Sequence, residues 1–345
     1  MNRPTVIDIA REAGVSLATV DRVLNARPGV RAKTIDAVHG AIARLGYVRD
    51  MAAANLARSR SYRIVALLPD SESQFVQTLA EALSEAAALA AASRTELDLQ
   101  RYPPEDMHIL AERLSSLSPD EVAGVALMAP ETPVIRDAIR ALKARGIPLV
   151  ALASDLPNTD RDHFIGTDSN AAGRTAGVLM GRFCRGQTGT VLAVADSMLL
   201  RDSIERRRGF DEVMLTSFPA LRIRPTIETH GSPEALRRAV GDCLASLPDV
   251  VGIYLIGSGH RALAALLRDM GMLGRFVVIG HELTPHTRQA LKAGHLDAVI
   301  AQNPGHLARS TLRVLRAKAD RSPIDEGQEQ LRIEVVIREN LPPEP

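Results

Sequence analysis

The sequence predicts an α/β protein in which a small all-α headpiece precedes two doubly wound parallel-sheet subdomains. Three observations predict this fold. Residues 5–45 carry apolar side chains at helical spacing, without the alternation of a strand. From residue 63 onward, short runs of Val, Ile and Leu alternate with longer helical segments. This alternation is typical of parallel sheets covered on both faces, and it occurs in two successive series.

The headpiece begins with two short helices. Thr5 and Asp8 have the spacing of a capping box, and Gly14 stands where a chain leaving a helix often needs a positive φ. Ser16 can cap a second helix over residues 17–24. Two such helices joined by a short turn containing glycine form a helix-turn-helix, whose second helix has the size that enters a DNA major groove. An ordinary αα-hairpin remains the alternative at this point.

A third helix is predicted over residues 32–45, ending before Gly46. Arg31, at its cap position, has no capping oxygen and can instead reach a phosphate. The three helices are expected to share one core, made of Ile9, Val15, Val20, Val23, Ile35, Val38 and Leu45. Residues 47–61 are rich in alanine but offer little apolar face, so they predict a marginal helix or a linker.

The two series of strands and helices fill the rest of the chain. Strands are expected at 63–68, 95–100, 124–129 and 148–153, and then at 189–195, 222–228, 252–256 and 275–279. The helices between them are expected at 73–92, 104–117, 133–145, 170–184, 200–216, 232–247 and 260–270. Ligands bind at the carboxyl ends of such strands, so a cleft between the two sheets is the expected binding site.

The composition is that of an ordinary globular protein, with 46% hydrophobic and 24% charged residues among 345. No apolar run is long enough to span a membrane, and the polar N-terminus does not resemble a signal peptide, so we expect a cytoplasmic protein. Cys184 and Cys243 are expected to be reduced core residues. Residues 1–61 carry a net charge of +5 and the others −4, which indicates that the amino end alone meets an anionic polymer.

Motifs for catalysis are weak or missing. Gly257-Ser258-Gly259 follows a predicted strand but lacks the full dinucleotide-binding pattern. The sequence has no phosphate-binding P-loop, no zinc-binding HExxH or paired CxxC, and no GxSxG nucleophile. Carboxylates do follow predicted strands, at Asp70, Asp155, Asp168 and Glu282. Without a nucleophile or metal beside them, we interpret them as hydrogen-bond acceptors, and we predict no catalytic residue, metal or cofactor.

Longer motifs carry a specific resemblance. TVIDIAREAGVSLATVDRVLN, VRAKTIDAV and IARLGYVRDMAAANLA resemble the headpiece of the lactose-repressor (LacI/GalR) family of transcriptional regulators. The later pieces IGTDSNAAGRTAG, ERRRGF, VVIGHEL and AVIAQNP resemble that family's effector domain, which is similar to periplasmic sugar-binding proteins. The resemblance covers essentially the whole chain, and it implies a periplasmic-binding-protein-like fold after the headpiece.

The resemblance implies a recognition helix that starts at Leu17. Leu17 and Ala18 fall where the family reads bases, and Arg22 matches a base-contacting arginine. Small apolar groups suit thymine methyls, and arginine suits guanine. Asp21 departs from the family, which commonly has a small hydroxyl residue there, so the operator sequence is left open. The other expected DNA contacts are Thr5, Ser16, Thr19, Asn25, Arg31 and Thr34.

The linker gains a role through the same resemblance. In the family this segment becomes a hinge helix on the operator, and a leucine wedges into the minor groove. Leu56 matches that leucine, and Asn55 lies beside it. Unstacking bases costs a few kcal/mol, which the contacts of the bent DNA offset.

The ligand site is expected at strand ends in the effector domain. Carboxylates, amides and arginine suit a sugar or polyol, and an arginine could also meet the charge of a sugar acid. Phe75 could stack on a sugar ring, and Asp168 is expected to cap a helix. The candidate ligand residues are Asp70, Phe75, Asp155, Arg201, Arg206, Ser258, Glu282 and Gln302.

The domains follow from these assignments. We expect a headpiece at 1–46, a hinge at 47–61 and an effector and dimerisation domain at 62–345. Its first subdomain would comprise 62–163 and 296–323, and its second 164–295 and 324–345, with crossovers near 160–165, 293–297 and 322–328. A helix at 305–321 would return to the first subdomain, and a strand at 333–337 to the second.

The function implied is that of an effector-controlled repressor. It would bind a pseudo-palindromic double-stranded operator as a homodimer, because one headpiece reads only a half-site. The alternative is a cytoplasmic sugar-processing enzyme, kinase-like, with an N-terminal helix-turn-helix.

Overall fold

The computed structural model describes residues 4–24, 28–47 and 61–343. The chain divides into two compact units, residues 1–60 and 61–345. The first unit holds three helices, α1 (Val6–Ala13), α2 (Leu17–Leu24) and α3 (Ala32–Leu45). Their shared core is centred on Ile9, Val20 and Val38, none of which is exposed. The predicted core is therefore correct, although Val15, Ile35 and Leu45 are only partly buried.

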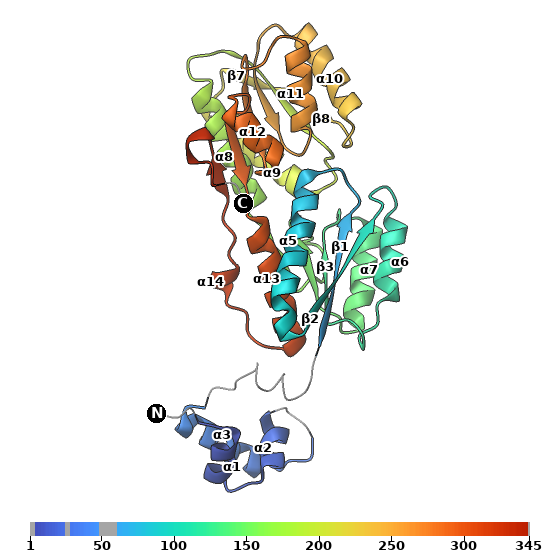
Figure 1. The fold of residues 1–345 in the computed structure, drawn as a ribbon, viewed down its shortest axis with the longest axis vertical. Coiled ribbons are helices and arrows are strands. Elements are labelled where there is room, and N and C mark those ends of the chain that lie inside the picture. Colours follow the sequence, from blue (N-terminus) through green and yellow to red (C-terminus); the bar gives the residue numbers. More distant parts are fainter. Residues whose placement is uncertain (1–3, 25–27, 48–60, 344–345) are drawn as a thin grey trace. The chain divides into compact units, whose positions relative to one another are not determined.

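The second unit contains two sheets with helices on both faces (Figure 1). We call the part built on the five-stranded sheet the first subdomain and the part built on the seven-stranded sheet the second subdomain. Predicted strands at 63–68, 124–129 and 189–195 are present at nearly the predicted positions. Their residues are almost all buried and mostly apolar, because helices cover both faces of each sheet.

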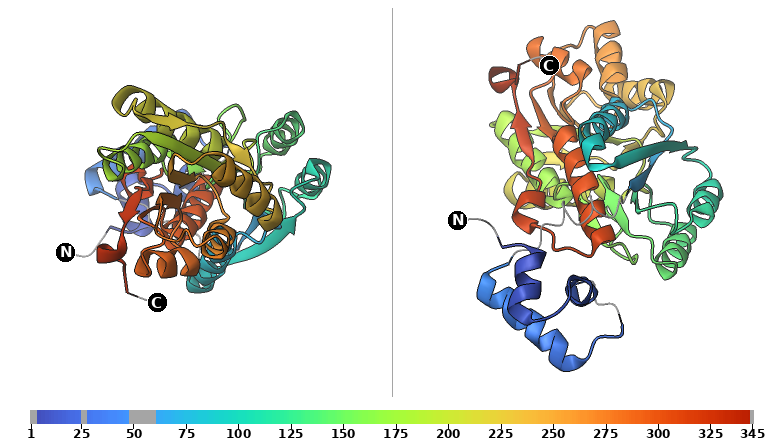
Figure 2. Two further views of the ribbon diagram at one scale, coloured as in Figure 1. Left: turned by 90° about the horizontal axis from the view of Figure 1, so that it is seen from above. Right: turned by 60° about the horizontal axis from the view of Figure 1, so that its bottom comes forward.

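The five strands of the first subdomain are all parallel, in the order β2-β1-β3-β4-β5. Their bounds are β1 Tyr62–Pro69, β2 Thr95–Tyr102, β3 Gly124–Leu127, β4 Leu149–Leu152 and β5 His163–Ile165. One face is covered by α5 (Gln74–Ala90, followed by the 3-10 turn Ala91–Ser93) and α13 (Pro304–Asp320), which lie side by side in Figures 1 and 2. The other is covered by α6 (Met107–Ser116) and α7 (Pro133–Ala144).

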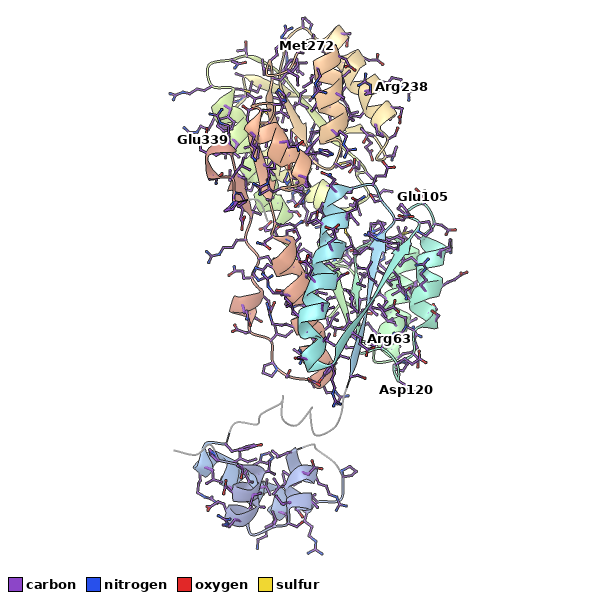
Figure 3. All side chains as sticks on the ribbon, viewed as in Figure 1. Arg63, Glu105, Asp120, Arg238, Met272 and Glu339 are labelled. Carbon is purple, nitrogen blue, oxygen red and sulfur yellow. The ribbon has the colours of Figure 1, made fainter. Side chains whose placement is uncertain are left out.

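The carboxyl and amino ends of this sheet are marked by labelled side chains in Figure 3. Glu105 lies in the loop that follows β2, at the carboxyl end. Arg63 near the start of β1 and Asp120 before β3 lie at the opposite end. Ligand contacts from the first subdomain are therefore expected on the side of Glu105.

The second subdomain has the strand order β12-β11-β10-β9-β6-β7, with β8 also paired to β6. These strands are β6 Gly189–Ala195, β7 Leu221–Ile223, β8 Ile227–Glu228, β9 Val250–Leu255, β10 Val277–His281, β11 Ala298–Ala301 and β12 Glu334–Val336. Only β12 runs antiparallel to its neighbour. Helices α8 (Ser169–Phe183) and α9 (Arg201–Ser217) cover one face. The other face holds α10 (Pro233–Ser246), α11 (His260–Asp269) and α12 (Pro285–Lys292).

The first predicted crossover, near 160–165, agrees with the structure to within a few residues, whereas the second, near 293–297, is wrong. β5 occupies residues 163–165 and pairs with β4, so the first sheet extends past the predicted boundary at 163. β11 occupies residues 298–301 and pairs with β10, so these residues belong to the second subdomain and not to the first. The chain therefore crosses after Ile165 and again just before α13.

The third crossover also lies later than predicted. After α13, the short helix α14 (Glu326–Glu329) stays with the first subdomain, because Arg313 holds Glu329 through two hydrogen bonds of 2.8 and 2.9 Å. Ile324 and Leu331 pack against the core of the first subdomain, whereas Ile333 packs against the second. As predicted, helix α13 returns to the first subdomain, and strand β12 returns to the second. A 3-10 turn, Arg338–Asn340, follows that strand.

Candidate DNA-binding surface and ligand site

The turn between α1 and α2 has the geometry that the sequence predicts. Thr5 Oγ1 accepts from the backbone nitrogen of Asp8, whose carboxylate accepts from the backbone nitrogen of Thr5. Gly14 has a φ of 65°, and Val15 donates its N–H back to the carbonyl of Ala10 at 3.0 Å. Left-handed backbone of this kind favours glycine. The turn therefore fixes where α2 leaves α1.

Helix α2 presents a face suited to a major groove. Leu17 is 50% exposed at its N-terminal end, and Ala18, Asp21 and Arg22 are exposed along it. Val20 and Val23 point into the core on the opposite side. The predicted base-reading residues thus share the exposed side of one helix, where base edges could be reached.

The hydroxyl residues of the headpiece also cap its helices. Ser16 Oγ accepts from the backbone nitrogen of Thr19 at 3.2 Å and lies 2.9 Å from Thr19 Oγ1. Arg31 occupies the cap position of α3, is exposed and makes no capping hydrogen bond. Thr34 is half-buried on the first turn of α3. The predicted contacts Asn25, Asn55 and Leu56 lie outside the described residues.

The second subdomain brings three predicted ligand residues together. Arg206 lies on α9, Glu282 directly follows β10, and Gln302 directly follows β11. Arg206 Nη2 and Gln302 Nε2 each donate to Glu282 Oε1 at 3.0 Å. Arg206 Nη1 donates to the carbonyl oxygen of Ile256, which directly follows β9, also at 3.0 Å. The three side chains therefore meet where neighbouring parallel strands end.

Asp202 belongs to the same group, although it is not among the predicted ligand residues. Its Oδ2 lies 3.8 Å from Arg206 Nη1, one turn earlier on α9. The i,i+4 spacing of the two residues is visible in the sequence, but the same spacing is common in exposed helix pairs. Only the fold reveals that their side chains are 16% and 7% exposed. We call Asp202, Arg206, Glu282 and Gln302 the polar centre.

Four atoms of the polar centre are buried and have no hydrogen-bond partner within the described ranges. They are Asp202 Oδ1, Arg206 Nε, Glu282 Oε2 and Gln302 Oε1. A buried polar atom without a partner costs about 1–3 kcal/mol. Because such atoms are rare and occur here together, they mark a place where a polar ligand can supply the missing partners.

Burial and pairing compete at the polar centre. Burial raises the pKa of Glu282, against the opposing effects of Arg206 and the Gln302 hydrogen bond. Burial by itself disfavours the Arg206 cation, but the carboxylates of Asp202 and Glu282 outweigh it and raise the pKa of Arg206. Arg206 therefore stays charged, and its charge is already compensated by the protein.

The backbone holds Glu282 in an uncommon conformation. Its φ is 67°, in the left-handed region that non-glycine residues seldom adopt. The backbone nitrogen donates to Ile300 at 3.0 Å, and the carbonyl accepts from Thr287 Oγ1 at 2.8 Å. This geometry aims the carboxylate at Arg206, and strained backbone of this kind clusters at functional sites.

Ser258 belongs to a second group at the carboxyl ends of β6, β8 and β9. Its backbone nitrogen and Oγ donate to Asp196 at 2.9 and 2.8 Å, and Thr229 Oγ1 lies 3.4 Å from the same carboxylate. Asp196 is absent from the predicted ligand residues, although it also directly follows a strand. The loop of Ser258 is thus tied to Asp196.

Four other candidates do not join the polar centre. Asp155 forms an ion pair with Arg161, and Arg201 donates to Glu205 at 2.6 Å. Asp70 is exposed after β1, and Phe75 packs on α5 against the core of the first subdomain. Neighbouring residues of opposite charge thus bind Asp155 and Arg201 in this structure, and their roles in ligand binding stay predictions.

The first subdomain offers one unpredicted polar group at its carboxyl edge. Ser154 is 1% exposed just after β4, and its Oγ has no hydrogen-bond partner within the described ranges. It follows Ala153, whose φ of 62° turns the chain sharply there. Asp168, by contrast, does what the sequence predicts, because its carboxylate caps α8 by accepting from Ala171 at 2.9 Å.

The remaining features concern metal ligands, thiols and apolar helices in the described part of the chain. No three His, Cys, Asp or Glu side chains there are grouped so that they could hold a metal ion. Cys184 and Cys243 are free thiols, and burial raises the pKa of Cys184 to about 11. None of the helices in the described ranges combines the length and apolar character that crossing a membrane requires.

Comparison with known proteins assigns both units. Residues 64–322 match the family described as "Periplasmic binding protein domain", and residues 5–50 match "Bacterial regulatory proteins, lacI family". Catabolite control protein A of Priestia megaterium is 30% identical over 150 residues, which is 44% of this chain and 43% of that protein. The match thus spans less than half the length of that relative.

Solved structures share the fold. An ABC-transporter solute-binding protein from Burkholderia graminis, in complex with D-arabinose, aligns with a TM-score of 0.73 at 22% identity over 81% of this chain and 96% of its own. A glucose-galactose binding protein from Geobacillus stearothermophilus aligns at 0.71 and 19% over 82% and 99%. The chain belongs to the periplasmic binding protein domain family through residues 64–322, and its residues 5–50 are similar to the corresponding segment of lacI-family bacterial regulatory proteins.

Proposed function

We propose that this protein is a sequence-specific transcriptional regulator whose affinity for its operator is set by a small polyhydroxylated effector. The observation that carries the proposal is the presence, in one chain, of an exposed recognition helix and a buried polar centre with four unpartnered atoms. The first is suited to DNA, and the second to a small polar molecule. A protein with both can convert the concentration of that molecule into operator occupancy.

The DNA contacts follow from the exposed side of α2. Leu17 and Ala18 would contact thymine methyl groups, and Arg22 would pair with guanine. Asn55 and Leu56 would complete the contact in the minor groove. Two copies of the chain would form a homodimer on a pseudo-palindrome, since each headpiece reads one half-site.

The effector would be held by Arg206, Glu282 and Gln302. Support comes from the sugars in the names of the structural relatives, D-arabinose and glucose-galactose, and from the control function in the name of catabolite control protein A. The protein would act in the cytoplasm as a repressor and would bind without catalysing a reaction. These assignments rest on the headpiece and the polar centre together.

The test of DNA recognition is selection from randomised duplexes by the full-length protein, followed by fluorescence anisotropy on the selected sequence. We expect a palindromic site whose affinity falls steeply with salt. Arg22→Ala should weaken binding about 5- to 150-fold for each half-site and relax the preference at one base pair of each half-site, since a bidentate base contact is worth about 1–3 kcal/mol.

The matched control is Arg140→Ala, which removes an exposed arginine from α7. It should bind the selected duplex like the unaltered protein. Failure to select any sequence, or equal selectivity with and without Arg22, would contradict the proposed DNA recognition.

A further inference from the structure

The polar centre holds more negative than positive charge. Arg206 is the only cation in the group, and it faces two carboxylates, Glu282 at 3.0 Å and Asp202 at 3.8 Å. The fourth member, Gln302, is neutral. All of these side chains are largely removed from solvent. Charges in such a place are weakly screened, so the surplus carboxylate acts strongly on whatever binds beside it.

The hydrogen-bonding capacity left in the polar centre is also one-sided. Gln302 donates its Nε2 to Glu282, and a carboxylate can only accept, so the amide oxygen of Gln302 is the atom left without a partner. Asp202 and Glu282 each add one unpartnered carboxylate oxygen, whereas Arg206 Nε is the single unpartnered donor. The centre therefore offers three acceptors and one donor. A molecule that satisfies it must bring mainly donors.

We propose that Asp202 makes this site selective for neutral polyhydroxylated effectors and excludes their carboxylated and phosphorylated counterparts. The inference rests on the proposed function, because it concerns the effector that controls DNA binding. A hydroxyl group can donate to each of the three oxygens and accept from Arg206 Nε. A carboxylate or phosphate has no hydrogen to donate to the three oxygen atoms of the polar centre. Its negative charge would also be repelled by the two carboxylates.

This inference revises the expectation that an arginine meets the charge of a sugar acid. Arg206 is compensated by Asp202 and Glu282, and Arg201 by Glu205. The positive charge of each guanidinium is therefore already balanced by a carboxylate of the protein. Asp202 is the decisive member, because without it the Arg206–Glu282 pair would be neutral overall and would tolerate an anion.

The experiment measures binding of matched probe pairs to the full-length protein by thermal shift and then by calorimetry. Each pair is an aldose and its aldonate: D-arabinose and D-arabinonate, D-xylose and D-xylonate, D-galactose and D-galactonate, and D-glucose and D-gluconate. Because aldonates are open chains, the corresponding alditols serve as neutral open-chain probes for each pair. Glucose 6-phosphate tests the phosphorylated class. We expect at least one aldose to bind, with its aldonate at least about 100-fold weaker.

Asp202→Asn keeps the shape of the side chain but removes the charge and exchanges an oxygen for a donor. The substitution should reduce the ratio of aldose affinity to aldonate affinity at least about tenfold, chiefly by strengthening aldonate binding. The control is Asp211→Asn on the same helix, where the carboxylate binds Arg207 and not Arg206. That variant should keep the selectivity of the unaltered protein. Retained binding of the selected DNA duplex verifies that both variants are folded.

The outcomes separate the inference from the proposed function. If an aldonate or the sugar phosphate binds the unaltered protein as tightly as its neutral counterpart, the proposed selectivity against anions is wrong. The proposed function as a transcriptional regulator is unaffected by that result. If folded Asp202→Asn discriminates as strongly as the unaltered protein, the role of Asp202 is overturned. If no probe binds although the protein selects a DNA sequence, the sugar effector and this inference fall together, and DNA recognition stands.

Discussion

Two imidazoles adjoin the polar centre: the buried His281, which directly precedes Glu282, and the half-buried His260, which contacts His281. His281 is 2% exposed, and its Nε2 lies 2.8 Å from the hydroxyl oxygen of Tyr254. His260 donates from Nε2 to the carbonyl oxygen of His281 at 3.1 Å, and its Nδ1 is buried without a partner within the described ranges. Burial lowers the pKa of His260 to about 4 and holds the pKa of His281 well below its ordinary value. Both rings are therefore neutral at pH 7.

These pKa values predict that stability falls between pH 7.5 and pH 5. Below about 6.5 an unfolded histidine takes up a proton, whereas native His260 stays neutral until about pH 4, so acid favours the unfolded chain. His260 alone should remove about 2 kcal/mol from the free energy of unfolding at pH 5. Urea unfolding at the two pH values measures this loss, and His260→Asn should reduce it by about that amount.

The control for the pH experiment is His108→Asn, since His108 is exposed on α6. This variant should lose as much stability on acidification as the unaltered protein. The attribution to His260 is wrong if His260→Asn shows the same loss, whatever its absolute stability.

The residues of the site were only partly predictable from sequence. Arg206, Glu282 and Gln302 could be found because the rule that ligands bind at strand ends identifies their segments. That rule does not tell which strand-end side chains the fold brings together, so it also included Asp155, whose partner is Arg161 and not a member of the polar centre. Asp202 could not be separated from an ordinary helix-surface acid, because its burial depends on strands that lie far away in the sequence.

At the scale of elements, periodicity predicted nearly every helix and long strand. It missed β5, β11 and α12, because segments of three to eight residues show too little repetition. The expected strand at 222–228 is divided into β7 and β8, since Pro225 between them has no N–H to donate to a ladder. The predicted subdomain boundary near residue 296 failed for the same reason, because β11 belongs to the sheet of the second subdomain.

The packing of α8 on α9 positions Arg206. The two helices approach so closely that a Cβ on Gly173 would lie 1.9 Å from the carbonyl oxygen of Arg206. Gly209 fits equally tightly, because a Cβ there would lie only 2.2 Å from the carbonyl oxygen of Asn170. Backbone atoms cannot move aside as flexible side chains do. The small residues therefore set how deeply Arg206 enters the site.

We predict that Gly173→Ala forces α9 away from α8. Overpacking of this kind costs about 1–3 kcal/mol, and the displaced Arg206 should also weaken aldose binding. Urea unfolding measures the first effect, and calorimetry with the best-binding aldose measures the second. Gly241→Ala on α10 is the control, because its Cβ would meet only Leu266, at 3.7 Å. It should stabilise the protein by about 0.5–1 kcal/mol. If Gly173→Ala and Gly241→Ala changed the free energy of unfolding and the aldose affinity equally, the close approach of α8 and α9 would not be what positions Arg206.

At the scale of the whole molecule, one helix connects the polar centre with the start of the effector domain. Asn303 follows Gln302 and caps α13 by accepting from His306 at 2.9 Å. Along its length α13 packs on the first subdomain. At its other end Asp320 accepts a hydrogen bond of 2.8 Å from Tyr62, the first residue of β1. Gln302 therefore adjoins a continuous helix whose other end contacts the first strand of the second unit.

Coupling through such a path must be reciprocal. If a bound aldose changes the affinity for the selected operator by some factor, the operator must change the affinity for that aldose by the same factor. Typical coupling free energies of about 1–3 kcal/mol predict a factor of about 5–150. Anisotropy with and without saturating aldose gives the first factor, and calorimetry of the free and operator-bound protein gives the second. A random duplex of equal length is the control and should leave aldose affinity nearly unchanged. An operator that leaves aldose affinity unaltered would mean that the effector domain binds sugar without controlling the headpiece.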